Sequence, residues 1–397
     1  MNSKKSLNNL IKKMLFMLMI IFIYVLGTHI PLPFAEATER YRMILEHTPM
    51  TIIGVMSGAD LNSLSVFSIG FNPFMIAMLV LQLLMMIRFM GIDALPINQI
   101  QVIQQIIILI LTVIQSTLFT LNIVKTDDIW KKISMILILT AGSLLVTWMC
   151  FMNIKHGIGG TSPIILINII SGLIPTLSQL IKNLKNLPYP NLWIILIIIL
   201  ALGTAYFWVA FSHAYYPLKT INTSLPSYAK PVIVPIGLNM GAMMTYMVGM
   251  AVLSITAMLA PYFSADSLLN NNYFKAGLSF LLAFVLFYFF TFMQFSPKEQ
   301  AKQLRNSNNY VLNIRPGKPT QRYLRRLVWI VAFPGAFLTA FQLALGLSGY
   351  QLLGNYAGIA VIPMDVVMMC MFTLGIKDQI ATLLYPYHYD RLKKKEG

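Results

Sequence analysis

The chain has 397 residues, of which 57% are hydrophobic and only 11% are charged. Its mean hydropathy of +0.71 excludes a water-soluble globular domain and predicts a polytopic membrane protein. The formal net charge of +16 is scattered over the segments between apolar runs. That distribution argues against a nucleic-acid-binding domain.

Hydropathy predicts ten spans, because each membrane-crossing helix needs about 20 apolar residues. In chain order they are residues 14–29, 72–90, 100–120, 133–153, 161–180, 192–214, 232–259, 276–295, 323–346 and 358–384. An even number of spans places both termini on one side. Most of the 29 Lys and Arg residues fall in segments on that side, so the positive-inside rule predicts that both termini are cytoplasmic.

The first apolar run follows Lys12 and Lys13 and therefore has the charge pattern of a signal peptide. No small-residue cleavage site follows it, and the sequence Pro31-Leu32-Pro33 stands there instead. We expect a retained first helix in the cell membrane.

The most informative segment covers residues 55–84, VMSGADLNSLSVFSIGFNPFMIAMLVLQLL. A short Gly- and Ser-rich stretch runs directly into a long apolar helix, with an irregular join at residues 68–73. Lipid offers no hydrogen-bond partners to irregular backbone. The join is therefore predicted to lie inside the protein or to line a water-filled cavity, as in a pore or an occluded site.

Motifs for catalysis are missing from the sequence. Cys150 and Cys370 both lie in apolar runs, which excludes a disulfide framework. The five histidines form no HExxH pair, and no GxSxG, Walker A or CxxC motif occurs. We expect no enzyme activity, no cofactor and no metal site, so energy for transport must come from a partner or a gradient.

Ionisable residues within the predicted spans are few. Asp365 follows Pro363 in the last span, and an intramembrane carboxylate is a functional candidate. Lys377 and Asp378 can neutralise one another near the cytoplasmic end of that span. A proton relay is poorly supported by this pattern.

Uncharged polar residues within the spans are more frequent. They are Gln82, Gln104, Gln105, Gln115, Asn168, Asn239 and Gln342. Each can simply join two helices by a hydrogen bond worth about 0.6 kcal/mol. Gln82, Gln115 and Asn239 would line a wet seam if their helices meet.

Basic residues cluster in the polar segment 296–326 and in the tail 391–395. Attraction to anionic lipid explains the tail, at about 1 kcal/mol per basic residue. The longer segment contains Arg315-Pro316-Gly317, and a turn there would present Arg315 to a partner.

Three separated blocks of the sequence resemble one family. They are MLFMLMIIFIYVLGTHIPLP, the segment SGADLNSLSVFSIGFNPFMIAMLVLQLL, and FSPKEQAKQLRNSNNYVLNIRPGKPTQRYL. In this order they are similar to the first helix, the plug with the second helix, and the large cytoplasmic loop of SecY, the protein-conducting channel. The block KHGIGGTSPIILINIISGLIP is similar to the start of the fifth helix of that family.

The resemblance implies an all-α polytopic membrane protein with ten transmembrane helices in two inverted five-helix halves around a central pore. The N-terminal half would be residues 1–185, with a plug at about 51–66. The C-terminal half would be residues 190–397, with the cytoplasmic loop 296–326 and the basic tail. An apolar ring and a movable plug would seal such a pore against ions.

The resemblance also implies roles for particular residues. The pore ring would comprise Phe71, Met75, Ile170, Ala242 and Thr373. The plug would contain Gly54, Ser57, Gly58, Ala59 and Ser63, and the lateral gate Gln82, Gln115, Asn239 and Met243. Arg315 would dock a motor protein, supported by Lys318, Arg322 and Arg305. The structural alternatives are ordinary helix packing for the ring and an interfacial half-helix for the plug.

One departure from the usual family pattern indicates a branch. The segment between the sixth and seventh spans is short and carries only Lys219 and Lys230, whereas the usual loop is longer and more basic. This pattern resembles the accessory branch of Gram-positive bacteria. It implies a dedicated SecA-type ATPase, small subunits like SecE and SecG, a secretory preprotein such as a serine-rich glycoprotein adhesin, and contact with anionic lipids but not nucleic acid.

Two other functions remain open from the sequence. A secondary transporter of a small or lipidic solute also uses inverted repeats and broken helices. It predicts midplane charge, which this sequence mostly lacks. An intramembrane protease or lipid transferase would need a nucleophile and base or a metal site, and no such motif is visible.

Overall fold

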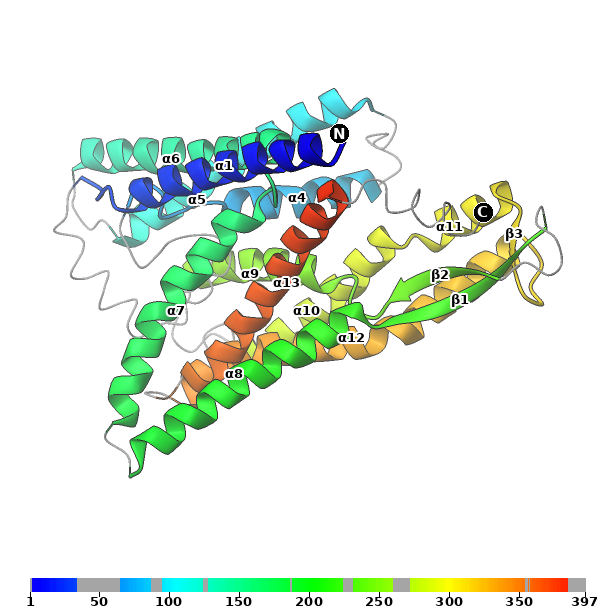
Figure 1. Ribbon diagram of the computed structural model, residues 1–397. Coiled ribbons are helices and arrows are strands. Elements are labelled where there is room, and N and C mark those ends of the chain that lie inside the picture. Colours follow the sequence, from blue (N-terminus) through cyan, green and yellow to red (C-terminus); the bar gives the residue numbers. More distant parts are fainter. Residues whose placement is uncertain are drawn as a thin grey trace. The chain divides into compact units, whose positions relative to one another are not determined.

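The computed structural model describes residues 2–33, 65–86, 95–123, 128–185, 188–223, 231–259, 272–353, 356 and 358–384. The chain forms two compact units. Unit 1 comprises residues 1–188, 250–270 and 369–397, and unit 2 comprises residues 189–249 and 271–368. Both units are built mainly of long helices (Figure 1).

Within its described residues, unit 1 contains five helices that begin and end in it. They are α1 (Asn2–Thr28), α4 (Asn72–Met86), α5 (Ile97–Ile123), α6 (Ile129–His156) and α7 (Ser162–Leu184). Helix α6 packs against both α5 and α1, and α5 also packs against α4. The buried face of α6 carries Met135, Leu139, Val146 and Met149, whose spacing of four, seven and three residues places them on one side of the helix.

Unit 2 contains α8 (Pro190–His213), α10 (Asn272–Gln294), α11 (Pro297–Asn306) and α12 (Lys318–Leu352). The most extensive contact between two helices of unit 2 joins α10 to α12, and aromatic side chains take part in it. The Tyr288 and Trp329 rings pack at a tilt with centroids 4.1 Å apart, and the Tyr288 hydroxyl donates to the Trp329 carbonyl at 3.1 Å. Helices α9 (Ala242–Leu259) and α13 (Gly358–Leu384) each contribute residues to both units.

A small sheet completes unit 2. Strand β1 (Tyr215–Asn222) lies between β2 (Val232–Gly237) and β3 (Asn309–Val311), and both pairings are antiparallel. The sheet packs with α11 and the first turns of α12 around a separate apolar core, formed by Leu218, Ile236, Phe295, Ala301, Leu304, Val311, Leu324, Leu327 and Val328. We call this assembly the polar-end subdomain, because α11, its flanking loops and the first turns of α12 carry most of the charged residues of unit 2.

Each of the ten predicted spans contains a helix. Among the described residues, eight helices are long and apolar enough to cross a membrane, and Asn72–Met85 is a shorter apolar helix. The prediction was wrong at the start of the seventh span. Residues 232–237 form strand β2, and the helix begins only at Ala242. Residues 318–326, predicted as loop, form the first turns of α12.

Candidate functional site

The irregular join before α4 is buried throughout. Ser68 is fully buried, Ile69 is 4% exposed, and Asn72, the first residue of α4, is 3% exposed. Gly70 has φ = 55°, a left-handed conformation that glycine adopts without a steric penalty. The prediction that this join lies inside the protein is confirmed.

Hydrogen bonds replace the partners that lipid cannot supply to this backbone. The Ser143 hydroxyl on α6 donates to the Gly70 carbonyl at 2.8 Å. The Ser68 hydroxyl donates to the Ser65 carbonyl at 2.7 Å and accepts from the Ser65 amide at 2.9 Å. The backbone of the irregular segment is therefore hydrogen-bonded by serine side chains where it is buried in unit 1.

Close packing fixes the same segment between α1 and α6. A Cβ atom at Gly142 would collide with the Val66 carbonyl, and one at Gly27 would collide with the Phe67 ring. The Phe67 ring also stacks on Tyr24, with centroids 5.7 Å apart. Only glycine allows the two helices to approach the segment this closely.

The predicted ring residues differ in their environments. Phe71 is buried immediately before α4 and Met75 is buried within it, and the Phe71 ring stacks on Phe74 with centroids 4.3 Å apart. Ile170 on α7 is 42% exposed, Thr373 on α13 is exposed, and Ala242 at the start of α9 is fully buried. Unit 1 contains Phe71, Met75, Ile170 and Thr373, and unit 2 contains Ala242.

Two glutamines of the predicted gate have buried amide atoms without hydrogen-bond partners among the described residues. Gln115 on α5 is 2% exposed, and neither its amide oxygen nor its amide nitrogen has a partner. The amide oxygen of Gln82 on α4 is likewise unpartnered. Helices α4 and α5 pack against each other, so unit 1 holds unsatisfied polar groups on neighbouring helices.

A stripe of small polar residues surrounds Gln115 on α5. Thr112, Ser116 and Thr120 recur every fourth residue and are fully buried. The Ser116 hydroxyl accepts a hydrogen bond at 3.0 Å from Thr140 on α6. The sequence analysis singled out Gln115 but missed this stripe, although its four-residue spacing was visible.

Unit 2 holds the other gate candidates. The Asn239 amide nitrogen lies 3.2 Å from the Ser212 hydroxyl, and its buried amide oxygen has no hydrogen-bond partner in the described part of the chain. Met243 is half-buried on α9. A second polar chain was not predicted. The Tyr246 hydroxyl donates to the Gln342 amide oxygen at 2.9 Å, and the Gln342 amide nitrogen donates to the Pro363 carbonyl at 3.1 Å. This chain joins α9, α12 and α13.

Arg315 lies in a defined turn of the polar-end subdomain. The Thr320 hydroxyl in the first turn of α12 donates to the Arg315 carbonyl at 2.8 Å, and Gly317 has φ = 99°. Because the Thr320 hydroxyl bonds the backbone of Arg315, the Arg315 side chain takes no part in holding the turn and is exposed. Lys318 and Arg322 on α12 and Arg305 on α11 are exposed on the same subdomain.

Two groups of predicted site residues lie outside the described residues. They are the plug candidates Gly54, Ser57, Gly58, Ala59 and Ser63, and the basic tail 391–395. Among the residues that the structure describes, no group of three side chains has the composition of a metal site.

The buried join and the helices that follow it match a known family. A family model described as SecY matches residues 65–378. The chain belongs to the SecY family. The matched region begins at the buried join and includes every described residue of the predicted ring, gate and docking face, so the family resemblance found in the sequence is confirmed.

Relatives place this SecY chain in the accessory branch, as the sequence indicated. It is 51% identical over 391 residues to the accessory Sec system protein translocase subunit SecY2 of Lactobacillus johnsonii, covering 98% of this chain and 99% of the relative. The protein of the same name from Streptococcus sanguinis is 26% identical over 402 residues, covering 96% and 98%.

Solved SecY-type structures share the fold. A structure of a protein conducting channel aligns with a TM-score of 0.64 and 13% identity, covering 96% of this chain and 94% of that chain. Sec61 from the canine ribosome-channel complex of the endoplasmic reticulum aligns with a TM-score of 0.59 and 12% identity, with the same coverage. The SecY-type helical fold and a multi-pass membrane protein, both predicted from the sequence, are therefore confirmed.

Proposed function

We propose that this SecY-family chain is the channel subunit of an accessory Sec translocase, through which unfolded polypeptides leave the cytoplasm. The observation that carries the proposal is the 51% identity to an accessory Sec translocase subunit over nearly the whole length of both chains. The buried join at Gly70 and the apolar side chains of Phe71 and Met75 beside it support the proposal, because a channel needs an apolar constriction at rest.

The channel has no energy source of its own in this proposal. A SecA-type ATPase docks on the exposed basic face around Arg315, with Lys318, Arg322 and Arg305 contributing charge. Small subunits like SecE and SecG complete the complex in the cell membrane, with both termini of the chain in the cytoplasm. The exported substrates are serine-rich glycoprotein adhesins.

Charge alone would give a basic face only lipid attraction, so the test reverses one charge in the turn. Arg315→Glu should abolish adhesin export in proteoliposomes that contain the channel and its ATPase, while insertion and thermal stability stay at wild-type values. The substitution spares the turn, because Thr320 bonds the backbone carbonyl of residue 315.

Lys185→Glu is the matched control, because Lys185 is also exposed but lies at the end of α7 in unit 1. It should export at the wild-type rate. Normal export by Arg315→Glu would refute the docking assignment. Absence of adhesin export from wild-type proteoliposomes that hold active ATPase would refute the proposed function itself.

A further inference from the structure

The turn between α6 and α7 holds a backbone amide that bonds a helix far along the chain. Gly159 is buried, and its amide donates to the side-chain oxygen of Gln379 on α13 at 2.7 Å. The two residues are 220 positions apart in sequence, and both belong to unit 1. A buried amide without an acceptor is destabilising, so this bond gives the Gln379 side chain a definite place against the turn. We call this pair of residues the α13 latch.

Asn153, near the end of α6, shapes the turn that presents this amide. Its side-chain nitrogen donates to the Ile158 carbonyl at 3.1 Å and to the Gly160 carbonyl at 2.6 Å. Its backbone carbonyl accepts from the Gly157 amide at 2.8 Å. Gly159 itself has φ = 81°, a left-handed conformation that favours glycine. These contacts hold the turn in place without any contribution from α13.

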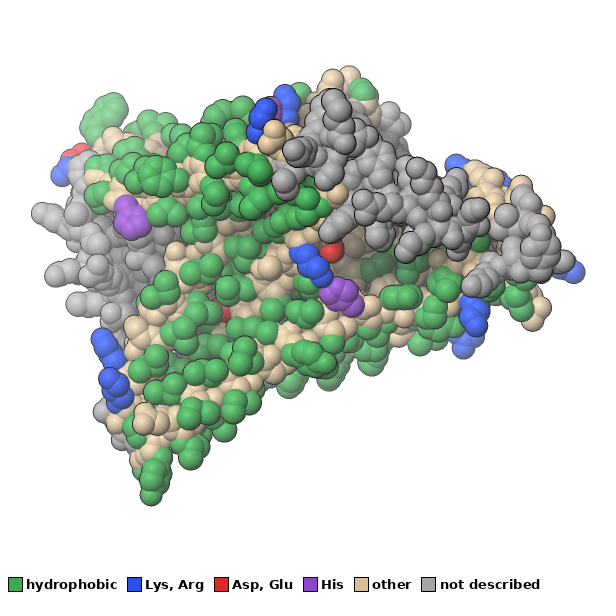
Figure 2. Space-filling model, viewed as in Figure 1, with side chains coloured by type: hydrophobic (Ala, Val, Ile, Leu, Met, Phe, Trp, Pro, Cys, Tyr) green, Lys and Arg blue, Asp and Glu red, His purple; other side chains and the backbone are tan. Residues whose placement is uncertain are grey.

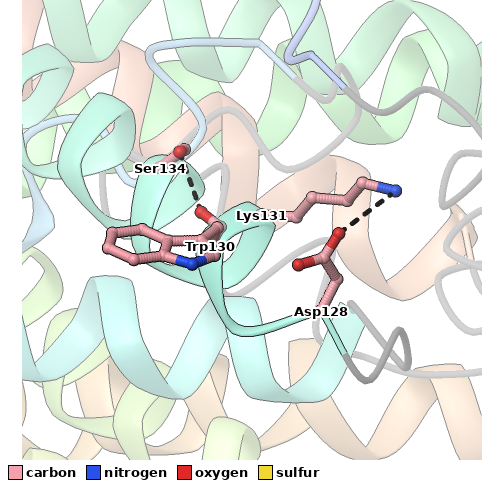
Figure 3. A network of polar contacts seen from close by, with 4 residues as sticks. All are labelled: Asp128, Trp130, Lys131 and Ser134. Carbon is pink, nitrogen blue, oxygen red and sulfur yellow. Dashed lines mark hydrogen bonds and ion pairs between the residues drawn. The ribbon is translucent and has the colours of Figure 1, made fainter.

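The opposite end of α6 makes local polar contacts instead. Asp128 and Lys131 form an ion pair at 3.6 Å, and the Ser134 hydroxyl donates to the Trp130 carbonyl at 2.8 Å (Figure 3). These four residues lie within about two helical turns of one another. Neighbouring residues thus provide these polar contacts at the beginning of α6, whereas the turn after α6 directs a buried donor at a separate helix.

Helix α13 is attached to each unit in a different way. Its residues 358–368 belong to unit 2, and its residues from 369 onward belong to unit 1. In unit 2 the Gln342 amide nitrogen donates to the Pro363 carbonyl at 3.1 Å, and most side chains of residues 361–368 are buried. Beyond Phe372, no residue of α13 is buried. The latch therefore holds a part of α13 that has little buried surface of its own.

The surroundings of the two attachments decide which of them opens more readily. Lys377 and Asp378, next to Gln379, are exposed. Figure 2 shows mainly hydrophobic side chains along the helices, with Lys, Arg and His colours gathered at helix ends. Water at such an end can bond Gly159 and Gln379 once they separate. The Gln342 bond lies within an apolar span, where lipid offers no replacement.

We propose that the α13 latch is a conformational switch, closed in the resting channel and released when the channel opens. A helix keeps its rise of about 1.5 Å per residue, so α13 does not lengthen when the two units move relative to one another. One of its attachments then has to open, and the exposed latch is the weaker one. The inference rests on the proposed channel function, which supplies the motion that the latch resists.

Two substitutions at Gln379 change the latch in opposite directions. Gln379→Leu removes the acceptor, and Gln379→Glu replaces it with a carboxylate, whose hydrogen bonds are roughly twice as strong. Gln379 is exposed, so neither change disturbs a core. Gln179→Leu is the matched control, because Gln179 is an exposed glutamine on α7 of the same unit.

The first experiment detects the latch itself and needs neither a motor nor a substrate. Hydrogen–deuterium exchange of the purified full chain in detergent is followed by mass spectrometry in a peptide that contains Gly159. Gln379→Leu should speed exchange of this amide about fivefold, which corresponds to about 1 kcal/mol. Gln379→Glu should slow the exchange, and Gln179→Leu should match the wild type. Equal exchange in Gln379→Leu and the wild type would overturn the latch.

The second experiment detects the switch in proteoliposomes, as potassium efflux without the ATPase or substrate and as export with both. Gln379→Leu should raise resting efflux about fivefold, because losing the bond shifts the population toward the open state by that factor. Gln379→Glu should keep efflux at or below the wild-type level and should export more slowly.

Unchanged efflux in Gln379→Leu, or an equal rise in Gln179→Leu, would overturn the switch. Absence of wild-type export with an active ATPase would refute the proposed function and the switch with it. The exchange experiment would still decide whether the latch exists.

Discussion

The Ser143 hydroxyl on α6 donates a hydrogen bond to the buried carbonyl of Gly70. The sequence predicted that the join is buried, because lipid cannot satisfy irregular backbone. It did not predict the partner. Ser143 and Gly70 lie 73 residues apart, and an isolated serine in an apolar run gives no indication of its acceptor.

Ser143→Ala should lower the stability of the protein by about 1–3 kcal/mol, because it leaves a buried carbonyl without its donor. The measurement is the melting temperature of the purified chain in detergent. Ser134→Ala on the same helix is the control, since the Ser134 hydroxyl is exposed and bonds only its own helix. Equal shifts in the two variants would contradict a special role for the Ser143 bond.

The buried Gln115 and the half-buried Gln342 should respond in opposite ways to replacement by leucine. Gln115 lacks partners for both amide atoms among the described residues, whereas Gln342 bonds both Tyr246 and Pro363. Removing an unsatisfied amide stabilises a protein, and removing a satisfied one leaves its partners unpaired. Gln115→Leu should therefore raise the melting temperature, and Gln342→Leu should lower it by the equivalent of about 1–2 kcal/mol. Shifts of the same sign would contradict this interpretation.

At the scale of elements, hydropathy predicted the helices well because each long apolar run has to satisfy its own backbone. It failed at residues 232–237, VIVPIG, because hydropathy does not separate a strand from a helix. A signal was present: branched residues favour strands, and Pro235 would break a helix interior. Pairing with β1, which places Pro217 opposite Pro235, decides in favour of the strand.

Helix α12 approaches the turn before α9 so closely that it needs a glycine. A Cβ atom at Gly335 would collide with the Leu238 carbonyl and press on the Phe287 ring, whereas one at Gly277 on α10 would meet nothing within 4 Å. Gly335→Ala should destabilise unit 2 by about 1–3 kcal/mol through overpacking. Gly277→Ala should be neutral or stabilise by up to about 1 kcal/mol. Thermal unfolding of both variants checks this, and a tolerated Gly335→Ala would show that the turn can move away.

At the scale of the whole molecule, the sequence resemblance identified the family and the branch, and the comparisons agree with both. Contacts group residues 250–270 and 369–397 with the N-terminal 188 residues. The division into two inverted halves, 1–185 and 190–397, stays a proposal. The ring residues Phe71 and Ala242 belong to different units, and their assembly into one constriction stays a proposal.

The central claim is that a polypeptide passes the side chains of Phe71, just before α4, and Met75, within α4. The most direct measurement places a photo-crosslinking amino acid at either position, in membranes that contain the cognate ATPase, and stalls a secretory polypeptide in transit. Position 109 is the control, because Leu109 on α5 is 51% exposed. We predict an ATP-dependent adduct at positions 71 and 75 and none at position 109. Confirmed export without any adduct at positions 71 and 75 would contradict the assignment of the pore.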